Sequence, residues 1–185
     1  MQYLYHVSET SGIKEFVPRK FWHINYRRSG PAYEGSDIPP NAEIITCFYA
    51  SPEEYSPFYY APQNCSRLYF SRRKNPEKFE LVAQVFGHLV SDKVLVFDKQ
   101  DHPSLESHTF FIYSFAAKDF QRLPNGEYVT YQTAIPIQET QHKNTLKHLF
   151  EAGYQIEFVE NLHKTRQTLS KLGLIVNAEG VRFEG

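Results

Sequence analysis

Alternating apolar and polar positions predict strands along most of this chain. The first run, residues 3–8, is aromatic and β-branched, and Leu4, His6 and Ser8 share one of its faces. The same pattern predicts further strands at 43–50, 66–71, 93–98, 109–115 and 154–159. A turn at Pro124-Asn125-Gly126 is expected to begin the longest strand, 127–135, and a hairpin is expected over 174–183.

Apolar residues at helical spacing predict helices between these strands. The clearest helix begins at Asn75-Pro76 and carries one apolar stripe, formed by Phe79, Val82, Val85, Phe86 and Leu89. Shorter helices are expected at 8–16, after Ser51-Pro52, around 146–150 and at 162–172. Predicted strands dominate the first two-thirds of the chain. Strands and helices alternate only near its end, over too few elements for a doubly wound sheet. The pattern therefore predicts an α+β fold of mostly antiparallel sheets flanked by short helices.

Residues 18–41 are rich in proline, glycine and turn formers, which predicts a long irregular loop. The aromatic and apolar residues between Phe21 and Tyr26 are unusual for a solvated linker. This stretch is either a lid that covers a cleft or a loop fixed to the core by Trp22. With 185 residues, the chain is expected to form a single domain over 1–185.

Charge and cysteine content narrow the function classes. The formal net charge is −1, so no global field attracts nucleic acid or anionic lipid. The basic run 72–74 is the densest, and it is more typical of a solvated edge than of a nucleic-acid site. Cys47 and Cys65 are expected to be reduced thiols in a cytoplasmic protein, and no signal peptide or membrane span is predicted.

Common cofactor motifs are absent from the sequence. It holds no Gly-x-Gly-x-x-Gly, no phosphate-binding P-loop and no Gly-x-Ser-x-Gly elbow, which argues against Rossmann oxidoreductases, P-loop NTPases and α/β-hydrolases. Asp98, Asp101, His102 and His108 could supply metal ligands from one polar connection. Such a cluster is more often solvated, and no metal is expected.

Three short motifs, in order, resemble those of the ADP-ribosyltransferase superfamily. Tyr5-His6-x-Ser8 resembles its first motif, although Val7 stands where a glycine usually follows the histidine. Residues 48–51 followed by Tyr59 are similar to its second motif, a strand and a helix-borne tyrosine. Residues 125–131 resemble the third motif of the poly-ADP-ribose polymerase branch, in which a glutamate, here Glu127, begins a strand.

The resemblance implies an ADP-ribosyltransferase-like split sandwich that binds NAD as a substrate and cleaves the nicotinamide–ribose bond. In this assignment His6 and Ser8 hold ribose hydroxyls, Tyr59 stacks on nicotinamide, and the carboxylate of Glu127 stabilises the oxocarbenium-like transition state. Tyr55 and Tyr60 compete with Tyr59 for the stacking role.

The chain also looks like an uncharacterised family of small bacterial proteins that begin Leu-Tyr-His-x-Ser and continue with a pattern matched here by Ile13, Phe16, Pro18 and Arg19. That resemblance implies no activity. A non-catalytic module that binds a ligand or a protein is the alternative, and neither an acceptor nor an oligomeric state is indicated.

Overall fold

The computed structural model describes residues 2–24, 28–52, 62, 65–72, 76–87, 89–124 and 127–174. The chain divides into two compact units, here called unit 1 (1–56 with 110–142) and unit 2 (57–109 with 143–185). Both units mix strands with helices or helical turns, which confirms the α+β class with mostly antiparallel sheets. The prediction of a single domain over 1–185 stays a prediction. In the described part of the chain, no helix is long and apolar enough to cross a membrane.

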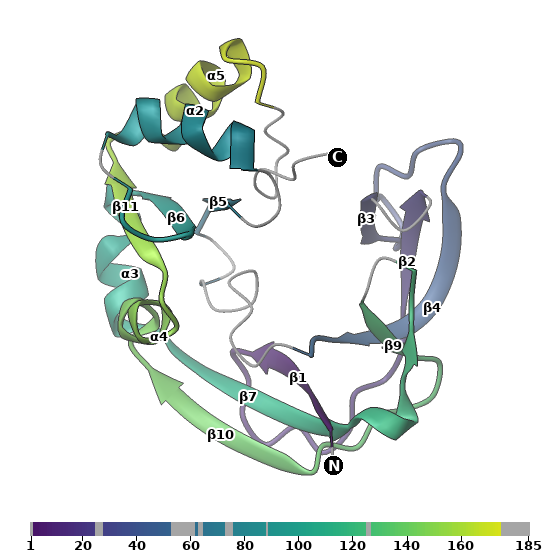
Figure 1. Ribbon diagram of the computed structural model, residues 1–185. Coiled ribbons are helices and arrows are strands. Elements are labelled where there is room, and N and C mark those ends of the chain that lie inside the picture. The colour runs from purple at the N-terminus through teal and green to yellow at the C-terminus, as the bar shows by residue number, and fades with distance from the viewer. Residues whose placement is uncertain are drawn as a thin grey trace. The chain divides into compact units, whose positions relative to one another are not determined.

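Unit 1 contains two groups of strands (Figure 1). In the first, β7 (Thr109–Ala116) lies between β1 (Tyr3–Ser8), which is antiparallel to it, and β10 (Gln138–Lys143). The second has the order β3-β2-β4-β9-β8, formed by β3 (Arg28–Pro31), β2 (Arg19–Ile24), β4 (Glu43–Ala50), β9 (Tyr128–Thr130) and β8 (Gln121–Arg122). A 3-10 turn, η2 (Ala117–Asp119), follows β7.

Strand β4 separates two apolar clusters because its side chains alternate between its faces. One face carries Phe48, which packs in an aromatic cluster with Phe16, Tyr113, Phe115 and Ala134. The other face carries Cys47 and Tyr49, which pack with Leu123, Val129, Phe21 and Ile45. We call these the Phe48 cluster and the Cys47 cluster. Side chains on opposite faces of β4 therefore have different neighbours.

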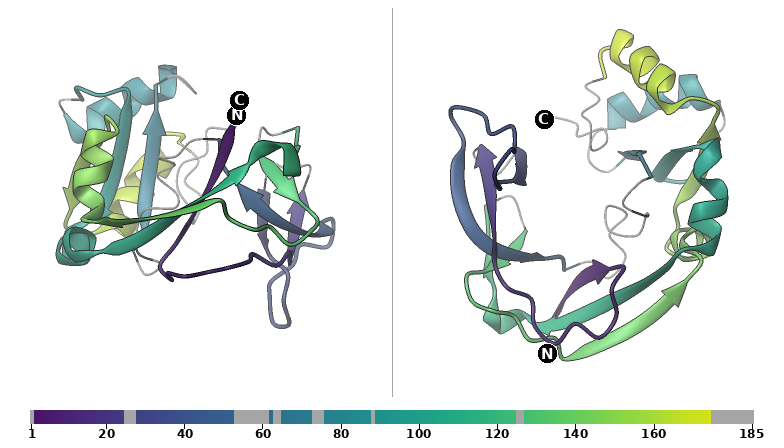
Figure 2. Two further views of the ribbon diagram at one scale, coloured as in Figure 1. Left: turned by 90° about the horizontal axis from the view of Figure 1, so that it is seen from below. Right: turned by 180° about the vertical axis from the view of Figure 1, so that it is seen from behind.

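Unit 2 is a three-stranded sheet with helices on both faces (Figures 1 and 2). Its central strand, β6 (Lys93–Asp98), runs parallel to β11 (Gln155–Val159) and antiparallel to β5 (Arg67–Ser71). Helices α2 (Pro76–Phe86) and α5 (Leu162–Lys171) cover one face through an aliphatic core that includes Leu68, Val94, Val96 and Leu169. Helices α3 (His102–Ser107) and α4 (Thr145–Glu151) lie on the other face, and η1 (Lys99–Asp101) joins β6 to α3.

Local capping explains where the helices of unit 2 begin and end. Asn144 and Asn161 each accept a hydrogen bond from a backbone N–H three residues later, at 2.9 Å, which caps α4 and α5. Gly153 and Gly173, at φ 83° and 77°, follow the ends of the same helices. These two helices confirm the predictions around 146–150 and at 162–172. The structure also confirms the helix predicted after Asn75-Pro76 and the strands predicted at 3–8, 43–50 and 93–98.

Two predicted elements of unit 1 differ from the structure. Residues 9–16 are irregular rather than helical, because the N–H of Thr10 bonds to Ser8 Oγ at 3.1 Å in a local turn and Gly12 has a φ of 70°. The strand predicted at 127–135 covers only Tyr128–Thr130. It stops there because Thr130 Oγ1 accepts a hydrogen bond from Gln132 N at 3.3 Å, which bends the chain.

The predicted irregular loop at 18–41 is wrong for most of its first half, which forms β2 and β3. Strand β2 pairs on one side with β3 and on the other with β4, so its backbone groups are used in the sheet. Phe21 packs edge-on against Tyr49, with ring centroids 5.1 Å apart. This agrees with a stretch fixed to the core, although through Phe21, and a lid role for 21–26 stays a prediction. The helix expected after Ser51-Pro52 and most of the hairpin at 174–183 lie outside the described residues.

Candidate functional site

The three motifs come from strands that are neighbours in unit 1. Tyr5 of β1 pairs with Ser51, directly after β4, through two backbone hydrogen bonds of 2.8 Å. On its other side β4 pairs with β9, with Phe48 opposite Thr130 and Ala50 opposite Tyr128. The spatial order is therefore β1, β4, β9, although the three segments are far apart in sequence.

His6 is held in one orientation by the backbone of β4. Its Nδ1 lies 3.2 Å from the carbonyl oxygen of Tyr49. A carbonyl can only accept, so Nδ1 carries the hydrogen and, in the neutral ring, Nε2 is an acceptor. Burial lowers the pKa of His6 from 6.5 to about 4, an effect that the bond to Tyr49 opposes and the charge of Arg19 reinforces. His6 is therefore a neutral imidazole at pH 7.

Aromatic side chains surround the His6 ring. Its centroid lies 5.1 Å from that of Phe16 and 4.8 Å from that of Phe48. Phe16 is fixed there by paired backbone hydrogen bonds with Ala134, of 2.8 and 3.0 Å. Tyr113, from β7, adds a second anchor, because its hydroxyl donates to Thr10 O at 2.8 Å and accepts from Ile13 N at 3.2 Å. His6 thus belongs to the Phe48 cluster.

Ser8 shares the face of His6 on β1, as its spacing predicted. Its Oγ accepts the N–H of Thr10, so one lone pair of the hydroxyl serves the local turn. A hydroxyl has one donor and two acceptor positions, which leaves Ser8 the chemistry needed to donate to a ligand oxygen.

Glu127 lies on the other side of β4. Paired residues of antiparallel strands point to the same face, so Val129 shares the face of Tyr49, and Glu127, two residues earlier, follows Val129. The carboxylate acts electrostatically on the Cys47 cluster: burial raises the pKa of both Cys47 and Tyr49, and the charge of Glu127 raises each further. His6 and Glu127 therefore point to opposite faces of β4.

The residues of β9 that do share the face of His6 are Tyr128 and Thr130, which pair with Ala50 and Phe48. The motif in the sequence indicates Glu127 and assigns no role to Tyr128 or Thr130. Because side chains alternate along a strand, Tyr128 and Thr130 must share one face and Glu127 and Val129 the other. Only the register of β9 on β4 decides which of these two pairs faces His6. Tyr59, Tyr55 and Tyr60 lie outside the described residues.

Three of the four residues that could supply metal ligands, Asp98, His102 and His108, make other contacts. Asp98 accepts backbone hydrogen bonds from Leu162 at 3.1 Å and Gln100 at 3.4 Å. His108 Nδ1 lies 2.7 Å from Thr145 Oγ1, and His102 Nδ1 lies 4.0 Å from Glu106 Oε2. Within the described ranges no three histidine, cysteine, aspartate or glutamate side chains gather as metal ligands would.

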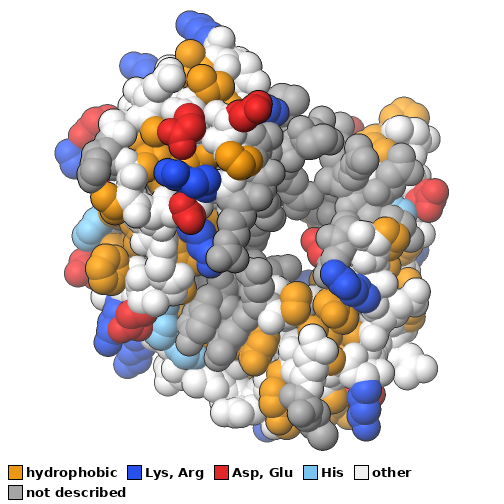
Figure 3. All heavy atoms as spheres, in the orientation of Figure 1, with side chains coloured by type: hydrophobic (Ala, Val, Ile, Leu, Met, Phe, Trp, Pro, Cys, Tyr) orange, Lys and Arg blue, Asp and Glu red, His pale blue; other side chains and the backbone are white. Residues whose placement is uncertain are grey.

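Charges of both signs are interspersed over unit 2 in the view of Figure 3. Arg72, from the basic run 72–74, pairs with Asp92 at 3.1 Å and with Glu80 at 3.6 Å. These contacts agree with a solvated edge at Arg72, while 73–74 lie outside the described residues.

The model of a family of unknown function, DUF6886, matches residues 5–184. The chain belongs to this family. No match to the chain was found among curated proteins or among solved structures. Membership of DUF6886 agrees with the resemblance to an uncharacterised family, and it carries no activity with it.

Proposed function

We propose that unit 1 of this DUF6886 chain is a nucleotide-binding module with an ADP-ribosyltransferase-like arrangement, and that NAD is its ligand. The observation that carries the proposal is the spatial order β1, β4, β9. The described parts of the three segments that resemble the superfamily's motifs lie on adjacent strands.

The state of His6 supports the same proposal. In a neutral imidazole whose Nδ1 donates to Tyr49 O, Nε2 has acceptor character, and a ribose hydroxyl is a donor of the matching kind. The Ser8 hydroxyl is two residues away on the same face of β1. Such a pair would hold a ribose by its hydroxyls.

Cleavage of the nicotinamide–ribose bond is the further step that the resemblance implies, and it has a geometric requirement. A carboxylate that stabilises positive charge on a ribose must face the same sugar as the residues that hold it. Glu127 and His6 point to opposite faces of β4. Binding is therefore the better supported part of the proposal, and catalysis by Glu127 stays a prediction.

The proposal is tested by calorimetric titration of the full chain with NAD, ADP-ribose and nicotinamide. His6→Asn keeps an amide donor near the position of Nδ1 and removes the acceptor at Nε2, so NAD affinity should fall by roughly 1–2 kcal/mol with little loss of stability. His6→Gln places its amide near Nε2 instead, and should retain NAD binding better while losing the bond to Tyr49. Equal NAD affinity in both variants and the wild type would refute a ribose contact by His6.

A nicotinamide-release assay separates binding from cleavage. If Glu127 acts on the transition state, Glu127→Gln should abolish release while NAD affinity changes little. NAD binding by the wild type without release would support the binding module alone. A wild type that binds none of the three compounds would overturn the proposal.

A non-catalytic module that binds a protein is the second candidate, and one observation favours it. The connection between β9 and β10 exposes large apolar side chains, with Tyr131 53%, Ile135 72% and Ile137 55% exposed. Exposed apolar residues that lie close together are typical of interaction surfaces. Failure of all nucleotide titrations would leave this candidate.

A further inference from the structure

A polar pocket in unit 2 lies at the end of the parallel strand pair. Strands β6 and β11 both end there, at Asp98 and Val159, and α5 begins beside them. The carboxyl ends of parallel strands are where ligands of α/β sheets commonly bind. The pocket has a volume of about 300 Å³, at the small end of the range for ligand sites. Its lining residues are Ser66, Asp98, Gln100, Asp101, Leu162, His163 and Arg166.

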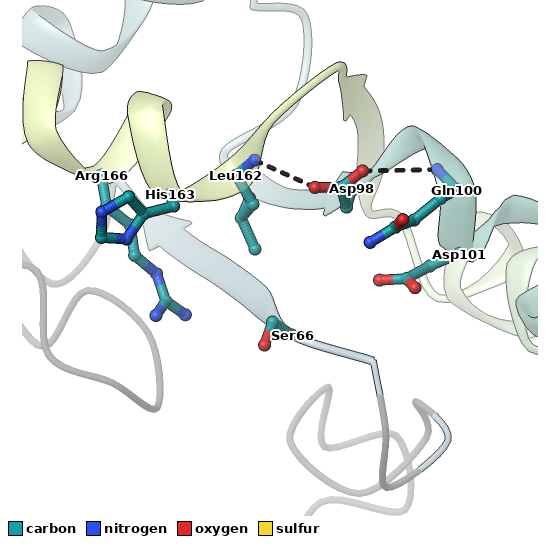
Figure 4. Close-up of a pocket in the computed structure, with 7 residues that line it drawn as sticks. All are labelled: Ser66, Asp98, Gln100, Asp101, Leu162, His163 and Arg166. Atoms are coloured by element: carbon teal, nitrogen blue, oxygen red, sulfur yellow. Dashed lines mark hydrogen bonds between the residues drawn. The ribbon is translucent and has the colours of Figure 1, made fainter.

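The charges of this pocket are separated by sign (Figure 4). Arg166 and His163 come from α5 and lie at one end, whereas Gln100 and Asp101 come from η1 and lie at the other. Ser66, directly before β5, lies between these two groups. A ligand in the pocket therefore meets a cation at one end and a carboxylate at the other.

Asp98 contributes to the wall rather than to recognition. Its two carboxylate oxygens accept the N–H groups of Leu162 and Gln100, and the first of these lies at the start of α5. The positive end of the helix dipole balances its charge there. Besides Asp98, the lining holds the acidic group of Asp101, which also accepts a hydrogen bond from the Cys65 thiol, and the basic group of Arg166.

Both of these groups are partly removed from water. Burial lowers the pKa of Arg166. Burial, followed by the charge of Asp98, raises the pKa of Asp101, and a hydrogen bond from the Cys65 thiol opposes that rise. Arg166 Nη2 donates to the carbonyl of Arg67 at 3.4 Å, which orients the guanidinium. A ligand that brings an opposite charge to each end would form charge-assisted hydrogen bonds with both groups.

We infer that this pocket binds a small aminocarboxylate, with its carboxylate on Arg166 and its ammonium group on Asp101. Gln100, Ser66 and His163 supply further hydrogen-bonding groups along the ligand. The site is independent of the nucleotide proposed for unit 1, because all of its lining residues belong to unit 2.

The test uses the full chain and a series of ω-amino acids, namely β-alanine, 4-aminobutyrate and 6-aminohexanoate, with butylamine and butyrate as probes of one charge each. Binding is followed through the backbone amide NMR shifts of Ser66, Gln100 and Leu162. We expect at least one ω-amino acid to shift these amides saturably, at least about tenfold more tightly than either probe with one charge. No saturable shift, or equal binding by butylamine or butyrate, would overturn the inference.

Three variants test which side chains contact the charged groups of the ligand. Asp101→Asn and Arg166→Gln should each weaken binding of the best ω-amino acid at least about tenfold. Lys164→Gln removes an exposed charge of α5 outside the pocket and should leave the affinity unchanged. Unchanged binding in either pocket variant would refute the assigned contact, and the wild-type titration decides the question even if a variant fails to fold. NAD titration of Asp101→Asn is expected to match the wild type, so the two proposals can fail separately.

Discussion

Acidification should destabilise the fold through His6 over a defined pH window. The pKa of His6 is about 4 in the folded protein, against 6.5 for the exposed side chain. Between these two values the unfolded chain binds a proton that the folded chain does not, so stability rises with pH and is lost as pH falls. The slope near pH 5 is about 1.2 kcal/mol per pH unit, and the loss between pH 7 and pH 4 is about 3 kcal/mol.

Urea unfolding of the wild type at several pH values from 7 to 4 measures this loss. Carboxylates elsewhere also titrate in that range, so the informative quantity is the difference in unfolding free energy between the wild type and His6→Asn. The asparagine cannot take up a proton, and it retains a donor for Tyr49 O. The unfolding free energy of the wild type, relative to that of the variant, should therefore fall by about 3 kcal/mol as the pH falls from 7 to 4.

His6→Gln provides a second reference, because it also removes the titrating group but changes the hydrogen bond to Tyr49. The two variants should differ from each other by a constant amount across the pH range, while the wild type diverges from both. Parallel stability curves for all three proteins would refute a buried, neutral His6.

Two further substitutions test the supports of the fold. Tyr113→Phe removes a fully buried hydroxyl that bonds to Thr10 and Ile13, and should lower the free energy of unfolding by roughly 2 kcal/mol, whereas the exposed Tyr33→Phe should change it by less than about 0.5 kcal/mol. Asn144 caps α4 from a left-handed conformation, so Asn144→Ala should cost roughly 1–2 kcal/mol in urea unfolding and Asn144→Gly less. A larger loss in the glycine variant would contradict this account of the cap.

Elements with a strong local pattern could be predicted from the sequence. Strand β6 is a buried apolar run, and α2 has a stripe at helical spacing, so both were found near their true bounds. Strand β2 was missed because the prolines and glycines around it have the composition of a loop. Its pairing with β3 and β4, which local composition does not record, makes it a strand.

The candidate site depended on information that a motif does not contain. The motifs in the sequence indicate both His6 and Glu127 as site residues. Whether the two side chains lie on the same face of β4 depends on the register of β9 on β4. A shift of one residue in that register would bring Glu127 to the face of His6. The pocket at Asp101 and Arg166 was also beyond sequence reasoning, because it needs two strands from distant segments to end side by side.

The parallel pair of unit 2 has a consequence for biosynthesis. Strand β6 belongs to the first segment of the unit, whereas its partner β11 and the covering helix α5 belong to the second. During translation, the apolar residues Val94–Phe97 leave the ribosome long before β11 can pair with them. The nascent chain therefore carries an unpaired hydrophobic strand edge until the last third of the chain has been made, and in that interval it is open to aggregation and to capture by chaperones.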